Sequence, residues 1–101
     1  MKIQKGKILV YTWGYDAHLA TFYYVVSTTP KSAKLAKIEN TVNTGSWHSG
    51  TAAVDTTKPL VLSKTIISKR IKGEGEGEYL SMDHGNARVW KGTPINTYNH
   101  H

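Results

Sequence analysis

The chain alternates short apolar runs with breaks rich in glycine, threonine and proline, a pattern typical of a small β protein. Residues 7–13 are rich in β-branched and aromatic side chains and end before Gly14, so they predict a strand. Residues 21–28 carry apolar side chains on both alternating faces. This second run therefore predicts a strand covered on both sides, in the middle of a barrel or sandwich.

Two structures compete for residues 29–40. Thr29 as an N-cap and Pro30 at the first helical position favour a helix, and the Ala, Lys and Leu residues that follow have good helix propensity. Alternatively, Pro30 and Lys31 form a hairpin turn, and the chain returns as a strand directly after residues 21–28. Propensity favours the helix and the short spacing favours the hairpin, so the residues alone leave both open.

The second half of the chain predicts short strands between loops. Residues 41–58 are polar and predict a long loop, with at most a short strand around residues 52–54. Residues 59–72 predict one or two strands with a basic end. An acidic Gly-Glu hairpin tip at 73–78, strands at 79–82 and 87–90 around a turn at 83–86, and an extended tail at 93–101 complete the chain.

With 101 residues, the chain is expected to form a single domain, 1–101. About six short strands and little helix predict a mainly β fold, a small barrel or sandwich that is SH3-like or similar. Cysteine is absent from the sequence, which excludes disulfides and thiolate zinc sites. No apolar run reaches the length of a signal peptide or membrane span, so we expect a cytoplasmic protein without a membrane partner.

Residues 11–26 contain six aromatic side chains, the last of them Tyr24, together with Gly14, Asp16 and His18. Clustered aromatics are usually buried, so we expect the corner of a hydrophobic core and not an exposed stacking site. Asp16 is expected to cap one helical turn over residues 17–20 or to close an Asx-turn.

Charge is unevenly distributed along the chain, which has a formal net charge of +6. Residues 1–73 hold eleven basic and three acidic residues, whereas residues 74–101 hold two basic and four acidic ones. A basic body favours binding to a polyanion through counterion release, although a solubilising surface charge has the same composition.

The basic residues form the strongest candidate site. Period-two alternation would put Lys64, Arg70 and Lys72 on one face of a strand, and Trp47 on the polar loop could stack beside them. The predicted nucleic-acid-binding residues are Lys64, Lys69, Arg70, Lys72, Lys34, Lys37 and Trp47.

The acidic tip is an alternative site. Glu74, Glu76 and Glu78 alternate with glycines and would repel phosphate, so the tip does not resemble a phosphate-binding loop. As an acidic finger, these three residues could instead occupy a basic groove on a protein partner.

Catalytic and metal-binding patterns are weak. The five histidines lack the spacing of a metal site, and Ser81 with Asp83 and His84 carries little information without geometry. We therefore predict a protein that is not an enzyme and that has no cofactor or metal.

The segments "KGKILVYTWGYDAHLATFYYVVSTTPKSAKLAKI" and "ARVWKGTPINTY" resemble a group of small, poorly characterised phage-encoded β proteins. These proteins share a Trp-Gly-Tyr-Asp turn, a Phe-Tyr-x-Val-Val strand and a closing Trp-x-Gly-x-Pro motif. The resemblance implies a phage origin, a mostly β fold and a strand rather than a helix over residues 31–39.

Two functions are consistent with these observations. The first is a non-enzymatic nucleic-acid-binding module that grips DNA or RNA with a basic strand face. The second is a phage-encoded inhibitor of a host defence nuclease, such as a CRISPR or restriction complex. The inhibitor would bind a host nucleoprotein complex in the host cytoplasm.

Overall fold

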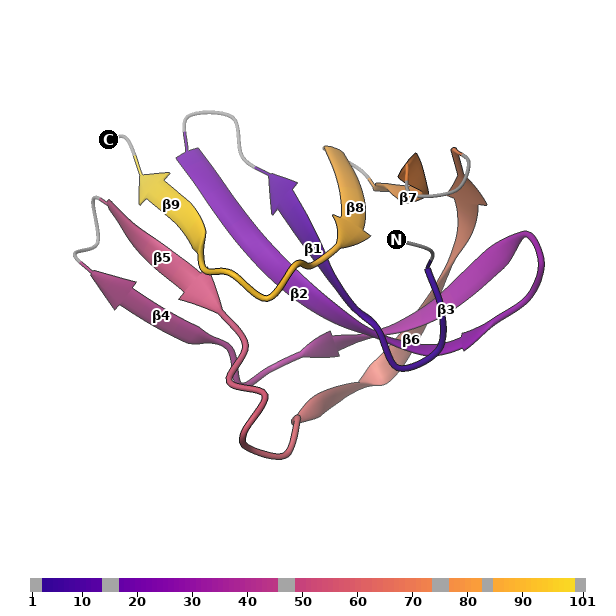
Figure 1. Ribbon diagram of the computed structural model, residues 1–101, viewed down its shortest axis with the longest axis horizontal. Coiled ribbons are helices and arrows are strands. Elements are labelled where there is room, and N and C mark those ends of the chain that lie inside the picture. Colours follow the sequence, from indigo (N-terminus) through magenta and orange to yellow (C-terminus); the bar gives the residue numbers. More distant parts are fainter. Residues whose placement is uncertain (1–2, 14–16, 46–48, 74–76, 83–84, 100–101) are drawn as a thin grey trace.

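The structure is a computed structural model that describes residues 3–13, 17–45, 49–73, 77–82 and 85–99 (Figure 1). Its regular elements are β-strands. In chain order they are β1 (Ile8–Trp13), β2 (Ala17–Thr28), β3 (Ser32–Ile38), β4 (Val42–Gly45), β5 (Ser49–Ala53), β6 (Leu62–Lys72), β7 (Tyr79–Met82), β8 (Gly85–Val89) and β9 (Ile95–Asn99).

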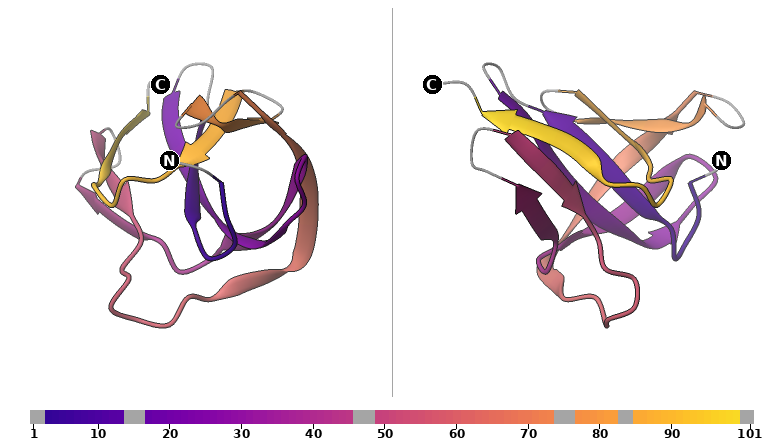
Figure 2. Two further views of the ribbon diagram at one scale, coloured as in Figure 1. Left: turned by 45° about the vertical axis from the view of Figure 1, so that its right-hand side comes forward. Right: turned by 60° about the vertical axis from the view of Figure 1, so that its left-hand side comes forward.

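Six of these strands close into an antiparallel barrel. The order is β1-β8-β7-β6-β3-β2, and the pairing of β1 with β2 completes the ring. The remaining strands, β9, β5 and β4, form a three-strand sheet beside the barrel (Figure 2). The predicted mainly β barrel is thus confirmed, and the strand count exceeds six because this second sheet was not anticipated.

Strand β2 belongs to both parts of the fold. Its first residues, Ala17 and His18, pair with Asn99 and Tyr98 of β9, whereas its later residues pair with β1 and β3. The predicted helical turn over residues 17–20 was wrong. The β1–β2 hairpin continues up to the pair Trp13↔Leu19, so ladder hydrogen bonds take the place of helical ones; Asp16 lies outside the described residues.

The predicted long loop over residues 41–58 was also wrong in its first part, where β4 and β5 form a hairpin. The four residues of β4 are all exposed, so no alternation of apolar residues reveals the strand in the sequence. A Cβ atom at Gly50 would lie 2.0 Å from the carbonyl oxygen of Thr44, so the close approach of the two strands there needs glycine.

The structure confirms the hairpin at residues 29–32 and the strand that follows it. The Thr29 N–H donates to the Ser32 carbonyl (2.8 Å), and the Ser32 N–H donates to the Thr29 hydroxyl oxygen (3.1 Å). These bonds close a turn around Pro30 and Lys31, the alternative that competed with the helix. Tertiary pairing of β3 with β2 and β6 overrides its helix propensity.

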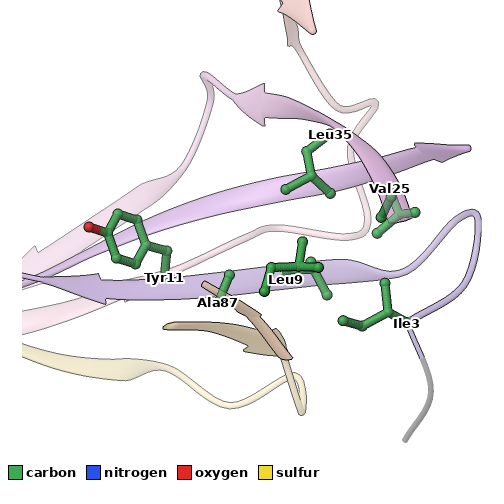
Figure 3. Packing of buried hydrophobic residues seen from close by; sticks show 8 residues of the cluster. Ile3, Leu9, Tyr11, Val25, Leu35 and Ala87 are labelled. Carbon is green, nitrogen blue, oxygen red and sulfur yellow. The ribbon is translucent and has the colours of Figure 1, made fainter. Parts of the chain in front are cut away.

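The barrel interior is filled by one hydrophobic cluster. Leu9 and Tyr11 of β1 lie beside Val25 of β2 and Leu35 of β3, with Ile3 at one end of the cluster and Tyr11 toward the other (Figure 3). Leu9, Val25 and Leu35 are fully buried. Alternation along each strand explains this arrangement, because every second side chain points into the closed ring.

A second cluster joins the barrel to the three-strand sheet. Phe22 and Ile38 of the barrel pack with Ala52 and Val54, and the rings of Phe22 and Trp90 meet edge to face with centroids 5.3 Å apart. Both faces of β2 are therefore covered, as its pattern predicted.

The described aromatic side chains of residues 11–26 either belong to the hydrophobic clusters or pack against them. Phe22 is fully buried and Tyr11 is 8% exposed, while Tyr23 and Tyr24 pack against the two clusters. The side chain of Trp13 lies outside the described residues.

The connection from β5 to β6 is held by short polar contacts. The Asn40 side chain donates to the Pro59 carbonyl (3.1 Å) and accepts from the Val61 N–H (2.9 Å). Hydrogen bonds from the side chain and backbone of Thr57 lower the pKa of Asp55 below its ordinary value. The contribution of the Asp55 carboxylate to stability is therefore present above its unfolded-state pKa and is lost as the pH falls through the lowered value.

Candidate nucleic-acid interface

The C-terminal half of β6 directs a row of polar and basic side chains away from the barrel core. Ser68, Arg70 and Lys72 are exposed and alternate with Ile67 and Ile71, which pack against the interior cluster. Because side chains in a strand alternate, the three exposed residues share the outer face.

Neighbouring strands extend this row on both sides. Lys34 of β3 is exposed and lies opposite Ser68, and Ser32 lies opposite Arg70. The Ile71 N–H donates to the carbonyl of Lys31 (2.8 Å), so the turn between β2 and β3 is fixed beside the end of β6.

Tyr79 of β7 lies between two basic residues. It is the register partner of Lys72 on β6 and of Arg88 on β8, so Lys72, Tyr79 and Arg88 form a row across three strands. The guanidinium carbon of Arg88 lies 5.1 Å from the centroid of the Tyr79 ring, a cation–π contact. We call the surface formed by Lys34, Arg70, Lys72, Tyr79 and Arg88 the basic face.

Three of the predicted binding residues do not lie on the basic face. Lys69 is half-buried and pairs with Ala33, so it lies on the core side of β6 between Ile67 and Ile71.

Lys64 and Lys37 are exposed but separated from the basic face. The β3–β6 register jumps from Ala36↔Ile66 to Ile38↔Leu62, which places Lys64 in an irregular stretch near the opposite end of β6. Lys64 is six residues from Arg70, about 20 Å along a strand. Lys64 is exposed, like Arg70 and Lys72, and the expectation that it shares a site with them stays a prediction. Lys37 pairs with Tyr23, on the opposite side of β3 from Lys34.

Some of the other predicted site residues lie outside the described residues. Trp47, Glu74 and Glu76 lie in segments that are not described. Strands β6 and β7 pair antiparallel on either side of the predicted tip, with Lys72 opposite Tyr79. A Cβ atom at Gly73, which has a φ of +82°, would lie 2.4 Å from the Gly77 carbonyl oxygen, so the close turn needs glycine there.

Glu78 makes a structural contact that the sequence did not suggest. It is half-buried, and its Oε1 accepts a hydrogen bond from the Ile3 backbone N–H at 2.9 Å. The Ile3 side chain, 5% exposed, belongs to the barrel cluster. Glu78 therefore fixes the N-terminal segment over the barrel.

Replacing Glu78 by alanine is expected to lower the free energy of unfolding by about 1–2 kcal/mol, because a charge-assisted hydrogen bond is lost. Glu78→Gln keeps a carbonyl acceptor and should retain most of the stability. Urea denaturation of both variants measures the difference. Equal stability of Glu78→Ala and the unchanged protein would show that this contact contributes nothing.

Sequence reasoning missed Tyr79 and Arg88. Strands at 79–82 and 87–90 around a turn at 83–86 would pair Met82 with Ala87 and hence Tyr79 with Trp90. The observed register pairs Met82 with Gly85 and Tyr79 with Arg88. The shift of two residues explains why sequence reasoning did not bring the tyrosine and the arginine together.

The site's chemistry is electrostatic. The described residues contain no group of three or more His, Asp or Glu side chains that could hold a metal ion. Within the same residues, no helical segment has the length and hydropathy of a membrane span. Four cations and one aromatic ring on one face can attract an anionic chain and can stack against a planar group.

Comparison with known proteins adds no further information about the site, since no protein-family model, curated protein or solved structure matches the chain.

Proposed function

We infer that the protein is a non-enzymatic nucleic-acid-binding module whose basic face contacts phosphates. The observation that supports this most strongly is the row Lys72, Tyr79 and Arg88, in which two cations flank an aromatic ring on adjacent strands. Lysine and arginine contacts to phosphates release counterions, which supplies most of the affinity in non-specific binding. Aromatic and guanidinium groups add stacking with bases.

The position of the basic face is consistent with a ligand of extended shape. Strands β6, β7 and β8 lie on the side of the barrel away from β4, β5 and β9 (Figure 1). The sheet formed by β4, β5 and β9 therefore leaves the face open, and Lys34, Arg70 and Lys72 are exposed on it.

The inhibitor hypothesis gains no specific support. Of its three glutamates, Glu78 is engaged with the Ile3 backbone, and Glu74 and Glu76 lie outside the described residues. An inhibitor that uses the basic face against a nuclease's bound nucleic acid would share the binding chemistry proposed here.

Backbone amide NMR shifts during titration with a short DNA oligonucleotide test the location of binding. We expect the largest shift changes at Lys34, Arg70, Lys72, Tyr79 and Arg88, because bound phosphates and bases change the local field there. Amides of β4 and β5 serve as the internal control and should not move. Changes centred on β4 and β5, or none at low salt, would contradict the proposal.

A further inference from the structure

Two features of the basic face bear on the form of nucleic acid that it accepts. One is the cation–π pair of Tyr79 and Arg88, and the other is the curvature of the barrel wall on which the pair lies. We propose that the basic face selects single-stranded over double-stranded nucleic acid and stacks an unpaired base against the Tyr79–Arg88 pair. This proposal rests on the proposed function.

The first argument concerns stacking. The Arg88 guanidinium lies over the Tyr79 ring at 5.1 Å, and the ring also adjoins Gly73, where an added Cβ atom would lie 3.3 Å from Tyr79 Cδ1. The ring therefore lies close to the backbone at Gly73 as well as to the Arg88 guanidinium. A planar guanidinium on an aromatic ring is a surface on which a base can stack. Bases in a duplex are already stacked on each other and cannot use it.

The second argument concerns shape. Six strands close the barrel, so each is turned by about 60° around the barrel axis relative to the next. Lys72, Tyr79 and Arg88 lie on three successive strands and therefore diverge over about 120° of a convex wall. A single strand bends around such a wall, whereas duplex DNA is stiff over about 150 base pairs. A duplex would reach few of the diverging cations at once.

The positive charge of the basic face favours binding of nucleic acid in either form. Phosphates of either form attract Lys34, Arg70 and Lys72, so the charge of these residues does not by itself select strandedness. Selection comes from the curvature of the wall and from stacking on Tyr79 and Arg88, and variants that preserve charge isolate the stacking contribution.

The test measures fluorescence anisotropy with three labelled DNA probes: a mixed-sequence single strand, its duplex, and an abasic strand of equal length. We expect the protein to bind the single strand at least tenfold more tightly than the duplex. The abasic strand keeps the phosphates but lacks bases, so its binding should be about 5- to 150-fold weaker than that of the normal strand.

Charge-preserving variants supply the matched controls. Arg88→Lys keeps the positive charge but loses the planar group, and Tyr79→Leu loses the ring. Both should lower affinity for the single strand toward that for the abasic strand, with little change for the duplex, whereas Tyr79→Phe should bind as the unchanged protein does. Circular dichroism melting verifies that each variant is folded. If Tyr79→Leu fails to fold, the Arg88→Lys variant alone tests the stacking proposal.

The outcomes separate this proposal from the proposed function. Binding of single strand, duplex and abasic strand with equal affinity would overturn the stacking proposal and leave the nucleic-acid-binding module standing. The stacking proposal would also be overturned if Arg88→Lys left single-strand affinity unchanged. Absence of binding to all three probes would overturn both.

Discussion

Replacing Phe22 by alanine is expected to lower the free energy of unfolding by about 3–5 kcal/mol, a large part of the 5–15 kcal/mol typical of a domain. Phe22 is fully buried in the second cluster, and its ring meets that of Trp90 edge to face. Removing it leaves a cavity where the barrel meets the three-strand sheet.

Urea denaturation followed by circular dichroism measures this change. Ile66→Ala is the matched control, because Ile66 is 47% exposed and should lose much less stability. In thermal denaturation, the melting temperature of Phe22→Ala should fall by roughly 4–8 °C for each kcal/mol of unfolding free energy lost. A Phe22→Ala variant as stable as Ile66→Ala would contradict the claim that Phe22 stabilises the fold through the second cluster.

Replacing Lys34, Arg70 and Lys72 together by glutamine is expected to weaken single-strand binding by about 10- to 100-fold near physiological salt, because three phosphate contacts and their released counterions are lost. The three side chains are exposed on one face and are not core residues, so the variant should remain folded. Fluorescence anisotropy with the labelled single strand measures the loss.

The control variant replaces Lys37, Lys58 and Lys64 by glutamine. Both variants change the formal net charge from +6 to +3, since each loses three of the basic residues. All three residues are exposed. Lys58 lies in the connection from β5 to β6, and Lys37 and Lys64 are not part of the basic face, so we expect the control to lose much less affinity. Equal losses would mean that overall charge, and not the basic face, determines binding.

Most of the barrel could be predicted from local pattern. Residues 7–13 and 21–28 alternate or are apolar on both sides, and both became barrel strands, β1 and β2. Residues 29–40 were ambiguous because their helix propensity conflicts with their position after a strand. The Thr29 hydroxyl closes the turn, and pairing with two neighbouring strands determines the outcome.

The second sheet could not be predicted in the same way. Strand β4 has no buried residue, so its sequence carries no alternation of apolar and polar positions. Its partner β5 pairs with β9, more than 40 residues later in the chain, and a pairing at that distance has no local signal.

The same difference between local pattern and long-range pairing applies to the residues of the candidate site. Arg70 and Lys72 were grouped correctly because both lie within one regular stretch of β6. Lys64 lies beyond the register shift between Ala36 and Ile38, which interrupts the regular pairing, so its place relative to the basic face could not be derived from alternation alone. Arg88 enters the site through cross-strand pairing, which period-two reasoning within a single strand does not reveal.

The salt dependence of single-strand binding tests the central claim, that the basic face binds phosphates, most directly. Between about 50 and 200 mM salt, log affinity should fall linearly with log salt, with a slope of about −2 to −3 if four cations each contact a phosphate. The Lys34/Arg70/Lys72 variant should flatten this slope by about two units, while the Lys37/Lys58/Lys64 control keeps it. A slope near zero, or the same flattening in both variants, would contradict the claim.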